Sequence, residues 1–201
     1  MMTVVYFRCL KKGLCCIKYW IPVTHLDLFR LEMYGGIDVV SVVRLVNSRV
    51  FRAQGKVPRI RFRGEEHYLA LRSRSNRACI FLTKSGKCSV HPFKPLVCRF
   101  YPFVYSVKGN GAIEIKVNED AAKECPGLIL DGKPIERELK LKLVRLAKVR
   151  IRELELYGKA VEEWNWELYS EHSRIDDLLE FLLNEAKKHY LILKIEGMWI
   201  K

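Results

Sequence analysis

The stretch CSVHPFKPLVCRFYPF, residues 88–103, combines two cysteines, a histidine and three prolines in one short segment and is the most informative part of this chain. Further cysteines lie outward from it in both directions: Cys9, Cys15 and Cys16 near the start, Cys79 just before it, and Cys125 after it. Seven thiols among 201 residues are too many for accidental core packing. Such a density is typical of metal binding or disulfides. The sequence therefore predicts a metal- or cluster-binding protein.

The cysteine spacing bears on which metal is bound. Structural zinc sites use cysteine pairs separated by about two to four residues, whereas the intervals here are five, zero, eight, nine and 26 residues. An iron–sulfur cluster is wider than one ion and can take ligands from scattered loops. We therefore predict a Cys-ligated iron–sulfur cluster of the 4Fe–4S kind, with zinc as the alternative. The vicinal pair Cys15 and Cys16 cannot easily aim both sulfurs at one ion, so one of them supports the site or serves another.

The expected compartment is the reducing cytoplasm. No run of 18 apolar residues is present, and the apolar start, residues 1–7, lacks the basic region and cleavage site of a secretory signal. Cytosolic cysteine clusters more often hold metal than form disulfides. Disulfides stay open as an alternative because Gln54 is the single glutamine among many Lys, Arg and Glu residues, a thermophile-like bias. Buried structural thiols are a further alternative.

The positive charge is concentrated in the cysteine half. Residues 1–131 hold 22 Lys and Arg against 10 Asp and Glu, a net of +12, and residues 132–201 hold 14 against 13, a net of +1. Ten basic residues face only Glu65 and Glu66 between residues 44 and 77: Arg44, Arg49, Arg52, Lys56, Arg59, Arg61, Arg63, Arg72, Arg74 and Arg77. Such a stripe can attract nucleic acid or an acidic protein. The preferred interpretation is a solvated face, because aromatic interleaving is sparse.

Local patterns predict short helices and strands through the first 130 residues. Thr24 and Asp27 form a capping box, and Gly35 with Gly36 ends that helix. A second helix is expected over residues 38–46. Strands are expected over 59–63, 68–71, 79–82, 88–90, 105–107 and 113–117.

The remainder, residues 131–201, is expected to form a helical hairpin without cysteine. Pro134 suits a first helical turn, Gly158 is a candidate break, and Ser173 with Asp176 is a candidate capping box for the second helix. Trp164, Trp166 and Trp199 are expected to pack between helices rather than to stack on bases. The predicted class is α+β: a small cysteine-rich domain, residues 1–130, with a helical extension, residues 131–201, packed on it.

The order of these motifs resembles a known family. Phe7-x-Cys9, Gly13-x-Cys15-Cys16 and a capped helix with Asp27 come first. They are followed by three cysteine motifs: Cys79-Ile80-Phe81-Leu82, then Cys88-Ser89-Val90-His91 with Pro95 and Cys98-Arg99-Phe100-Tyr101-Pro102-Phe103, then Cys125-Pro126-Gly127. The arrangement is similar to the CxxCxxCC family of zinc- or iron-chelating proteins, also called YkgJ-like cysteine-cluster proteins. Flagellin lysine N-methylases carry a related domain. The resemblance covers about residues 5–130 and implies a cysteine-bound metal.

The chain departs from the family pattern at two positions. The first family motif is C-x2-C-x2-C-C, and Lys12 stands at its second cysteine. Lys94-Pro95 replaces the usual Arg-Pro, which is a milder change. If the family builds two four-cysteine sites, this chain fills one and leaves the other with three ligands. Alternatively, the position of Lys12 never required a cysteine.

The predicted ligands rank in two groups. Cys9, Cys16, Cys88 and Cys98 come first because they lie in the best-matched motifs, and Cys15, Cys79 and Cys125 follow. His25 and His91 are weaker candidates. No nucleotide-binding loop, Gly-rich fingerprint or Ser-His-Asp order is present, which leaves open whether the protein is an enzyme. The predicted role is electron transfer, or support of a modification such as lysine methylation, with an unidentified protein or redox partner. The competing prediction is a structural-zinc module that recruits nucleic acid or an acidic partner.

Overall fold

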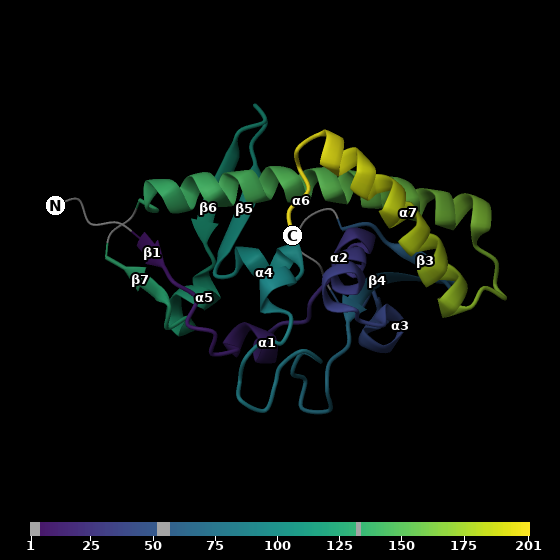
Figure 1. Ribbon diagram of the computed structural model, residues 1–201, viewed down its shortest axis with the longest axis horizontal. Coiled ribbons are helices and arrows are strands. Elements are labelled where there is room, and N and C mark those ends of the chain that lie inside the picture. The colour runs from purple at the N-terminus through teal and green to yellow at the C-terminus, as the bar shows by residue number, and fades with distance from the viewer. Residues whose placement is uncertain (1–4, 52–56, 132–133) are drawn as a thin grey trace.

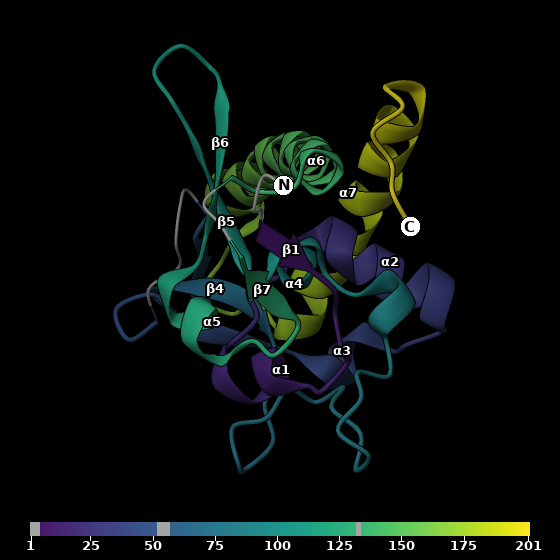
Figure 2. The same ribbon diagram turned by 90° about the vertical axis from the view of Figure 1, so that its left-hand side faces the viewer.

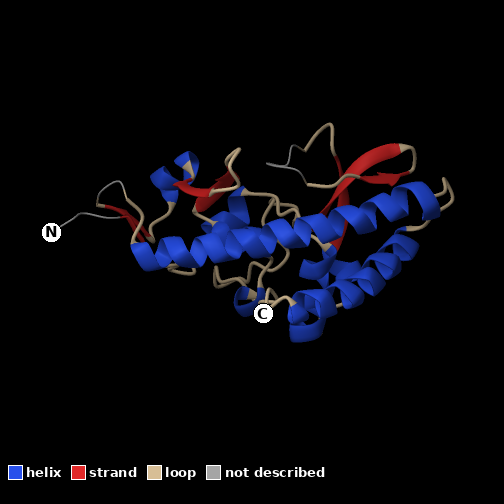
Figure 3. Cartoon of the chain, turned by 90° about the horizontal axis from the view of Figure 1, so that it is seen from above, coloured by secondary structure: helices blue, strands red, loops and turns tan. Residues whose placement is uncertain are grey.

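One long helix organises the molecule. The computed structural model describes residues 5–51, 57–131 and 134–201. Helix α6 (Arg137–Glu163) runs along the whole length of the protein, and the remaining elements lie along it (Figures 1 and 3). It continues into a π-helical turn, Trp164–Leu168, and α7 (Ile175–Ile195) then folds back as the second arm of the predicted hairpin. The α+β class predicted from the sequence is confirmed.

Three small antiparallel sheets complete the fold. β1 (Val5–Phe7) pairs with β7 (Leu128–Leu130). β2 (Val43–Asn47), β4 (Glu65–Leu71) and β3 (Ile60–Phe62) form a sheet in the order β2-β4-β3. β5 (Phe103–Val107) and β6 (Ile113–Val117) form a hairpin whose tip extends away from the body (Figure 2). The short helices are α1 (Leu14–Lys18), α2 (His25–Gly35), α3 (Val39–Val42), α4 (Leu96–Phe100) and α5 (Glu119–Glu124), with a 3₁₀ turn, η1, at His91–Phe93.

Helix α2 has the ends that its sequence predicted. The Thr24 hydroxyl accepts a hydrogen bond from the backbone N–H of Asp27, and the Asp27 carboxylate accepts one from the N–H of Thr24. This reciprocal capping box satisfies two N–H groups that have no partner inside the helix. Gly36 ends the helix in the left-handed conformation, with φ at 59°.

Four predictions of local structure are wrong. The expected helix over 38–46 is the single turn α3 followed by strand β2, since its valines favour an extended chain. Residues 79–82 and 88–90 form isolated bridges and turns rather than strands. Pro134 precedes α6, which Glu136 caps instead. The second capping pair is Arg174 and Asp177, one residue later than predicted.

Two further predictions fail along the long helix. Gly158 does not break α6, because its backbone stays helical and its open side lies near Pro58. Trp164 and Trp199 pack between helices as expected, but Trp166 is 77% exposed.

A charged helix of this length does not resemble a membrane segment, and no helix among the described residues is apolar enough to cross a bilayer.

The main core joins the two parts of the chain. One buried cluster contains residues from both parts: Leu28 of α2, Val43 of β2 and Cys79 from the first, and Tyr157 of α6 and Leu178 of α7 from the second. A second cluster lies under the β5–β6 hairpin, where Phe103 and Ile115 meet Leu143 of α6. The cysteine-rich segment therefore packs directly on α6 and α7, while the boundary at residue 130 stays a prediction.

Candidate metal centre

Helix α1 carries the vicinal cysteines, and a glycine sets its position. Gly13 precedes α1 with φ at 68°, and a Cβ there would lie 2.5 Å from the carbonyl oxygen of Gly86. Only glycine fits both the left-handed backbone and this close approach. The turn around Gly86 therefore packs against the start of α1, which brings the loop between Cys79 and Cys88 toward the vicinal pair.

Turns hold the next two cysteines beside α1. The backbone N–H of Cys79 donates to the carbonyl of Cys16 at 2.7 Å. Cys79 also bridges to Ser73, and Cys88 bridges to Leu82. These few backbone bonds replace the two expected strands, so the thiols lie on short turns rather than on a regular sheet.

Helix α4 positions Cys98 and is anchored from α2. The N–H of Leu96, the first residue of α4, donates to the Asp27 carboxylate at 2.9 Å. The N–H of Cys98 donates to the carbonyl of Pro95 at 2.9 Å. Asp27 is fully buried, so this bond ties the cysteine helix to the core rather than to the surface.

Six of the seven cysteines line one cavity of about 1150 Å³. We call these six residues the cysteine wall: Cys9, Cys15, Cys16, Cys79, Cys88 and Cys98. Cys16 and Cys79 are buried, Cys9 is exposed, and the other three are half-buried. All seven cysteines of the chain lie in the described residues, and each is a free thiol. Cys125, at the end of α5, does not line the cavity.

Hydrogen bonds between thiols polarise the centre of this wall. Side-chain hydrogen bonds that Cys15 and Cys88 share with Cys16 lower the pKa of Cys15 to about 6 and that of Cys88 to about 7. Lys94 lowers both pKa values further through its positive charge. The same two bonds raise the pKa of Cys16. Cys15 and Cys88 are therefore the most readily ionised of this trio. Because thiolates rather than thiols bind metal, these two are the thiols best prepared to act as ligands.

The remaining wall cysteines have different surroundings. Burial raises the pKa values of Cys79 and Cys98. The Cys9 sulfur lies 3.7 Å from Nε2 of His91, and His91 also lines the cavity. His25, by contrast, does not line it, and its Nε2 lies 2.7 Å from Nδ1 of His189 in the helical core.

The chemistry of the wall fits a thiophilic metal. Several thiols on one cavity form a soft donor set, which selects zinc, copper(I) or iron–sulfur clusters over hard cations. Within residues 5–51, 57–131 and 134–201, no three His, Cys, Asp or Glu side chains converge on a position that could hold a single ion. The donors are thus spread along the wall, and the assignment of individual ligands stays a prediction.

The cavity also contains features that the sequence reasoning missed. It extends from the thiols to the β5–β6 hairpin and α6, where Tyr105 and Arg150 line it. Lys94 and the aromatic residues Tyr19 and Trp20 belong to the same lining. The helical periodicity marks Arg150 as a buried-face position of α6, so this signal was present in the sequence.

The basic stripe is partly engaged in local contacts. Arg59 pairs with Glu66 at 2.9 Å, and Arg72 and Arg74 donate to backbone carbonyls. Arg61 differs, because its guanidinium lies 5.7 Å from the ring of the exposed Trp166 and 5.5 Å from that of Tyr169. Arg52 and Lys56 lie outside the described residues.

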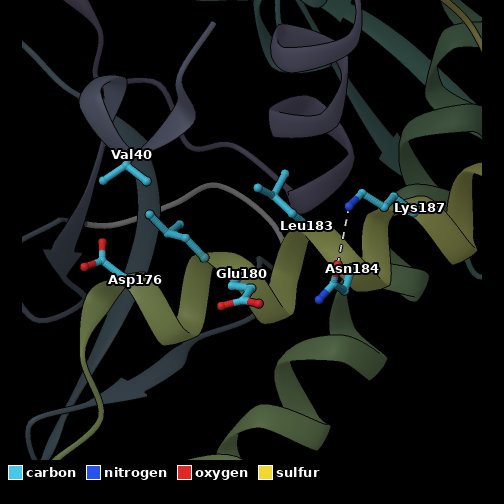
Figure 4. Close-up of a pocket in the computed structure, with 7 residues that line it drawn as sticks. Val40, Asp176, Glu180, Leu183, Asn184 and Lys187 are labelled. Carbon is cyan, nitrogen blue, oxygen red and sulfur yellow. Dashed lines mark hydrogen bonds between the residues drawn. The ribbon is translucent and has the colours of Figure 1, made fainter.

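A separate hollow on α7 contains no cysteine. It measures about 390 Å³ and is lined by Asp176, Glu180, Leu183 and their neighbours, together with Val40 (Figure 4). Lys187 donates to Asn184 there at 3.4 Å. Its donors are a few exposed surface groups, so it is a poorer candidate site than the thiol-lined cavity.

Comparisons with known proteins agree with the chemistry of the wall. The CxxCxxCC family, described as "Putative zinc- or iron-chelating domain", matches residues 8–126. A relative from Methanocaldococcus jannaschii, the uncharacterized protein MJ0661, is 28% identical over 135 residues. That alignment covers 67% of this chain and 64% of the relative. No solved structure matches the chain. The family match spans more than half of the sequence and includes every residue of the cysteine wall, so the chain belongs to the CxxCxxCC family of zinc- or iron-chelating domains.

Proposed function

We propose that this protein binds an iron–sulfur cluster through thiolates of the cysteine wall. The observation that carries the proposal is the convergence of six cysteines, from four separate segments of the chain, on one cavity. Cys15, Cys16 and Cys88 form its centre, because Cys16 lowers the pKa values of both other thiols through side-chain hydrogen bonds. Cys79 and Cys98 lie near enough to interact electrostatically with that trio.

The spread of the donors favours a cluster over a single ion. A cluster presents several iron atoms and accepts cysteine ligands from separate loops. The wall draws its thiols from the segment that contains Cys9 and α1, from two turns and from α4. Zinc is the alternative, because four thiolates from the same set also satisfy a tetrahedral ion. Both the cluster and the zinc ion would use the same cysteine sulfurs as ligands.

The role we propose for the centre is electron transfer. Iron–sulfur clusters exchange electrons at potentials set by hydrogen bonds, charge and solvent exposure. The wall offers a range of solvent exposure, from exposed Cys9 to buried Cys16 and Cys79, and the positive charge of Lys94. Support of a protein modification such as lysine methylation, the other role predicted from the sequence, depends on the family resemblance alone.

Metal and acid-labile sulfide content tests the proposal. The full chain is purified without air, and iron, zinc and sulfide are measured per protein for the wild type, Cys16→Ala and Cys125→Ala. Iron with about equimolar sulfide is expected in the wild type. Cys16→Ala is expected to lose most of both, and Cys125→Ala to keep both because Cys125 does not line the cavity.

The outcomes separate the alternatives. Zinc without sulfide would replace the cluster with a zinc site on the same wall. Metal lost equally in both variants would contradict the assignment to the wall. No iron or zinc in the wild type would overturn the proposal as a whole.

A binding module is a second candidate function, favoured by one observation. Arg61 lies against the exposed ring of Trp166, which gives the basic stripe an aromatic platform. Single-strand binding proteins combine such stacking with positive charge. Fluorescence anisotropy of a labelled single-stranded RNA, measured over a salt series, tests this function. It requires binding that weakens steeply with salt and falls in Trp166→Ala but not in the matched exposed variant Leu168→Ala.

A further inference from the structure

A buried arginine lines the same cavity as the thiols. Arg150 of α6 is 7% exposed, and its Nη1 is buried without a hydrogen-bond partner. No Asp or Glu of the described residues forms an ion pair with it. The segments outside the description, 1–4, 52–56 and 132–133, contain no Asp or Glu, so no carboxylate partner comes from there.

The nearby carboxylates are already occupied. Glu153, one turn further along α6, accepts hydrogen bonds from both terminal nitrogens of Arg30. Asp27 accepts from Arg30 and from the N–H groups of Thr24 and Leu96. Arg99 belongs to the same electrostatic neighbourhood. Both carboxylates therefore pair with Arg30, and the three arginines exceed the two carboxylates by one positive charge, so neither Arg99 nor Arg150 has an ion pair among the described residues.

An unpaired buried cation is expensive for a protein to keep. Taking a charge out of water is strongly unfavourable unless a partner of opposite charge compensates it. Arg150 lies on the boundary of a cavity, where a ligand can supply that partner. We propose that this cavity binds a small organic molecule through a single carboxylate held by Arg150.

The lining fits that chemical class. The guanidinium fork matches the two oxygens of a carboxylate. The Tyr105 hydroxyl is close enough to Arg150 that the guanidinium opposes the increase of its pKa by burial. Tyr19, whose hydroxyl is also buried without a partner, lines the same space. Aromatic lining residues suit an apolar or aromatic body: Tyr19, Trp20, Phe100, Tyr101, Phe103 and Tyr105.

A single carboxylate fits better than a phosphate. The other lining cations, Lys11 and Lys94, belong to the thiol part of the cavity, where Lys94 interacts with Cys15 and Cys88. Glu155 also lines the cavity and already pairs with Arg152 at 3.3 Å. One free guanidinium balances one negative charge, whereas a phosphate dianion would require a second cation.

The test compares a carboxylate with its neutral amide. Binding of 3-phenylpropionate, 3-phenylpropanamide and phenyl phosphate to the full chain is measured by calorimetry. Wild type is expected to bind the carboxylate roughly ten- to a hundredfold more tightly than the amide, the range for a charge-assisted hydrogen bond. Arg150→Gln is expected to lose that preference. The matched control Arg145→Gln, on the exposed face of α6, is expected to keep it.

The metal centre provides a separate readout, because this proposal does not depend on it. The same titrations are run on metal-loaded and chelator-stripped protein. A preference for the carboxylate that disappears on stripping but persists in Arg150→Gln would mean that the metal holds the carboxylate, and would overturn the proposal. Equal binding of carboxylate and amide, tighter binding of phenyl phosphate, or no saturable binding at millimolar concentration would also overturn it. If Arg150→Gln does not fold, the comparison of the three probes on wild type still decides.

Discussion

The buried cluster of Asp27, Arg30 and Glu153 and the cysteine wall are two polar interiors built in opposite ways. The cluster is closed: Arg30 donates to both carboxylates and to the carbonyl of Ile200, and its guanidinium lies 4.1 Å from the ring of Trp199. The wall is open: its thiols line a cavity, and no carboxylate of the described residues pairs with them as the carboxylates of the cluster pair with Arg30. In the closed cluster the polar groups find their partners within the protein. The thiols of the open wall are instead available to a bound metal.

The two regions are joined through Asp27. Its carboxylate pairs with Arg30 and also accepts from the first N–H of α4, the helix that carries Cys98. The closed cluster thus holds the open wall in place. Changes in the cluster are therefore expected to alter stability, and changes in the wall to alter metal binding with little effect on the fold.

The largest expected effect comes from breaking the closed cluster. Arg30→Met leaves Glu153 and Asp27 buried without their cation, so the free energy of unfolding should fall by roughly 3–5 kcal/mol. Urea unfolding measures this. Arg152→Met, which breaks a surface pair with Glu196, is the matched control and should cost less than about 1 kcal/mol. Similar losses in both variants would contradict the distinction.

A smaller effect is expected from the buried histidines beside the cluster. Burial lowers the pKa values of His25 and His189 below the ordinary value. Below about pH 6.5 the unfolded chain takes up protons that the folded chain does not. Stability should therefore fall as the pH drops below about 6.5, by up to about 1.4 kcal/mol per pH unit for each histidine.

The variant His25→Phe tests this pH dependence. Its unfolding free energy, measured from pH 7.5 down to pH 5, should change less than that of wild type. His172→Gln removes an exposed histidine and should follow the wild-type curve. Parallel curves for all three proteins would show that the buried pair does not contribute.

In the wall, a change of about tenfold in thiol reactivity is expected. In metal-free protein the pKa of Cys15 is lowered to about 6, so its thiolate fraction should fall about tenfold between pH 7 and pH 5. Burial raises the pKa of Cys79, which should react slowly at both pH values. Alkylation followed by mass spectrometry measures both rates. Faster reaction of Cys79 than of Cys15 at pH 7 would contradict the polarised trio.

The smallest effect is expected at the cap of α2. Thr24→Ala removes a hydroxyl that accepts from Asp27, and should cost about 1 kcal/mol in urea unfolding. Metal content should not change, because Asp27 keeps its bonds to Arg30 and Leu96. A loss of metal in this variant would show that the wall depends on α2 more closely than the comparison allows.

Local signals predicted much of the fold but little of the cavity. The capping box at Thr24, the β5–β6 hairpin and the two long helices depend on neighbours in sequence, which the chain displays directly. The strands expected at Cys79 and Cys88 are turns, because a few bonds to α1 replace a sheet partner. The pairing of Cys16 with Cys88 and the approach of Arg150 need tertiary packing over long separations, which no local pattern encodes.

X-ray absorption at the iron and zinc edges, on protein purified without air, tests the central claim most directly. We predict a first shell of sulfur alone around iron, with a neighbouring iron beyond it, and loss of that signal in Cys16→Ala but not in Cys125→Ala. A first shell made of nitrogen or oxygen, or a sulfur shell that persists unchanged in Cys16→Ala, would contradict a centre held by the cysteine wall.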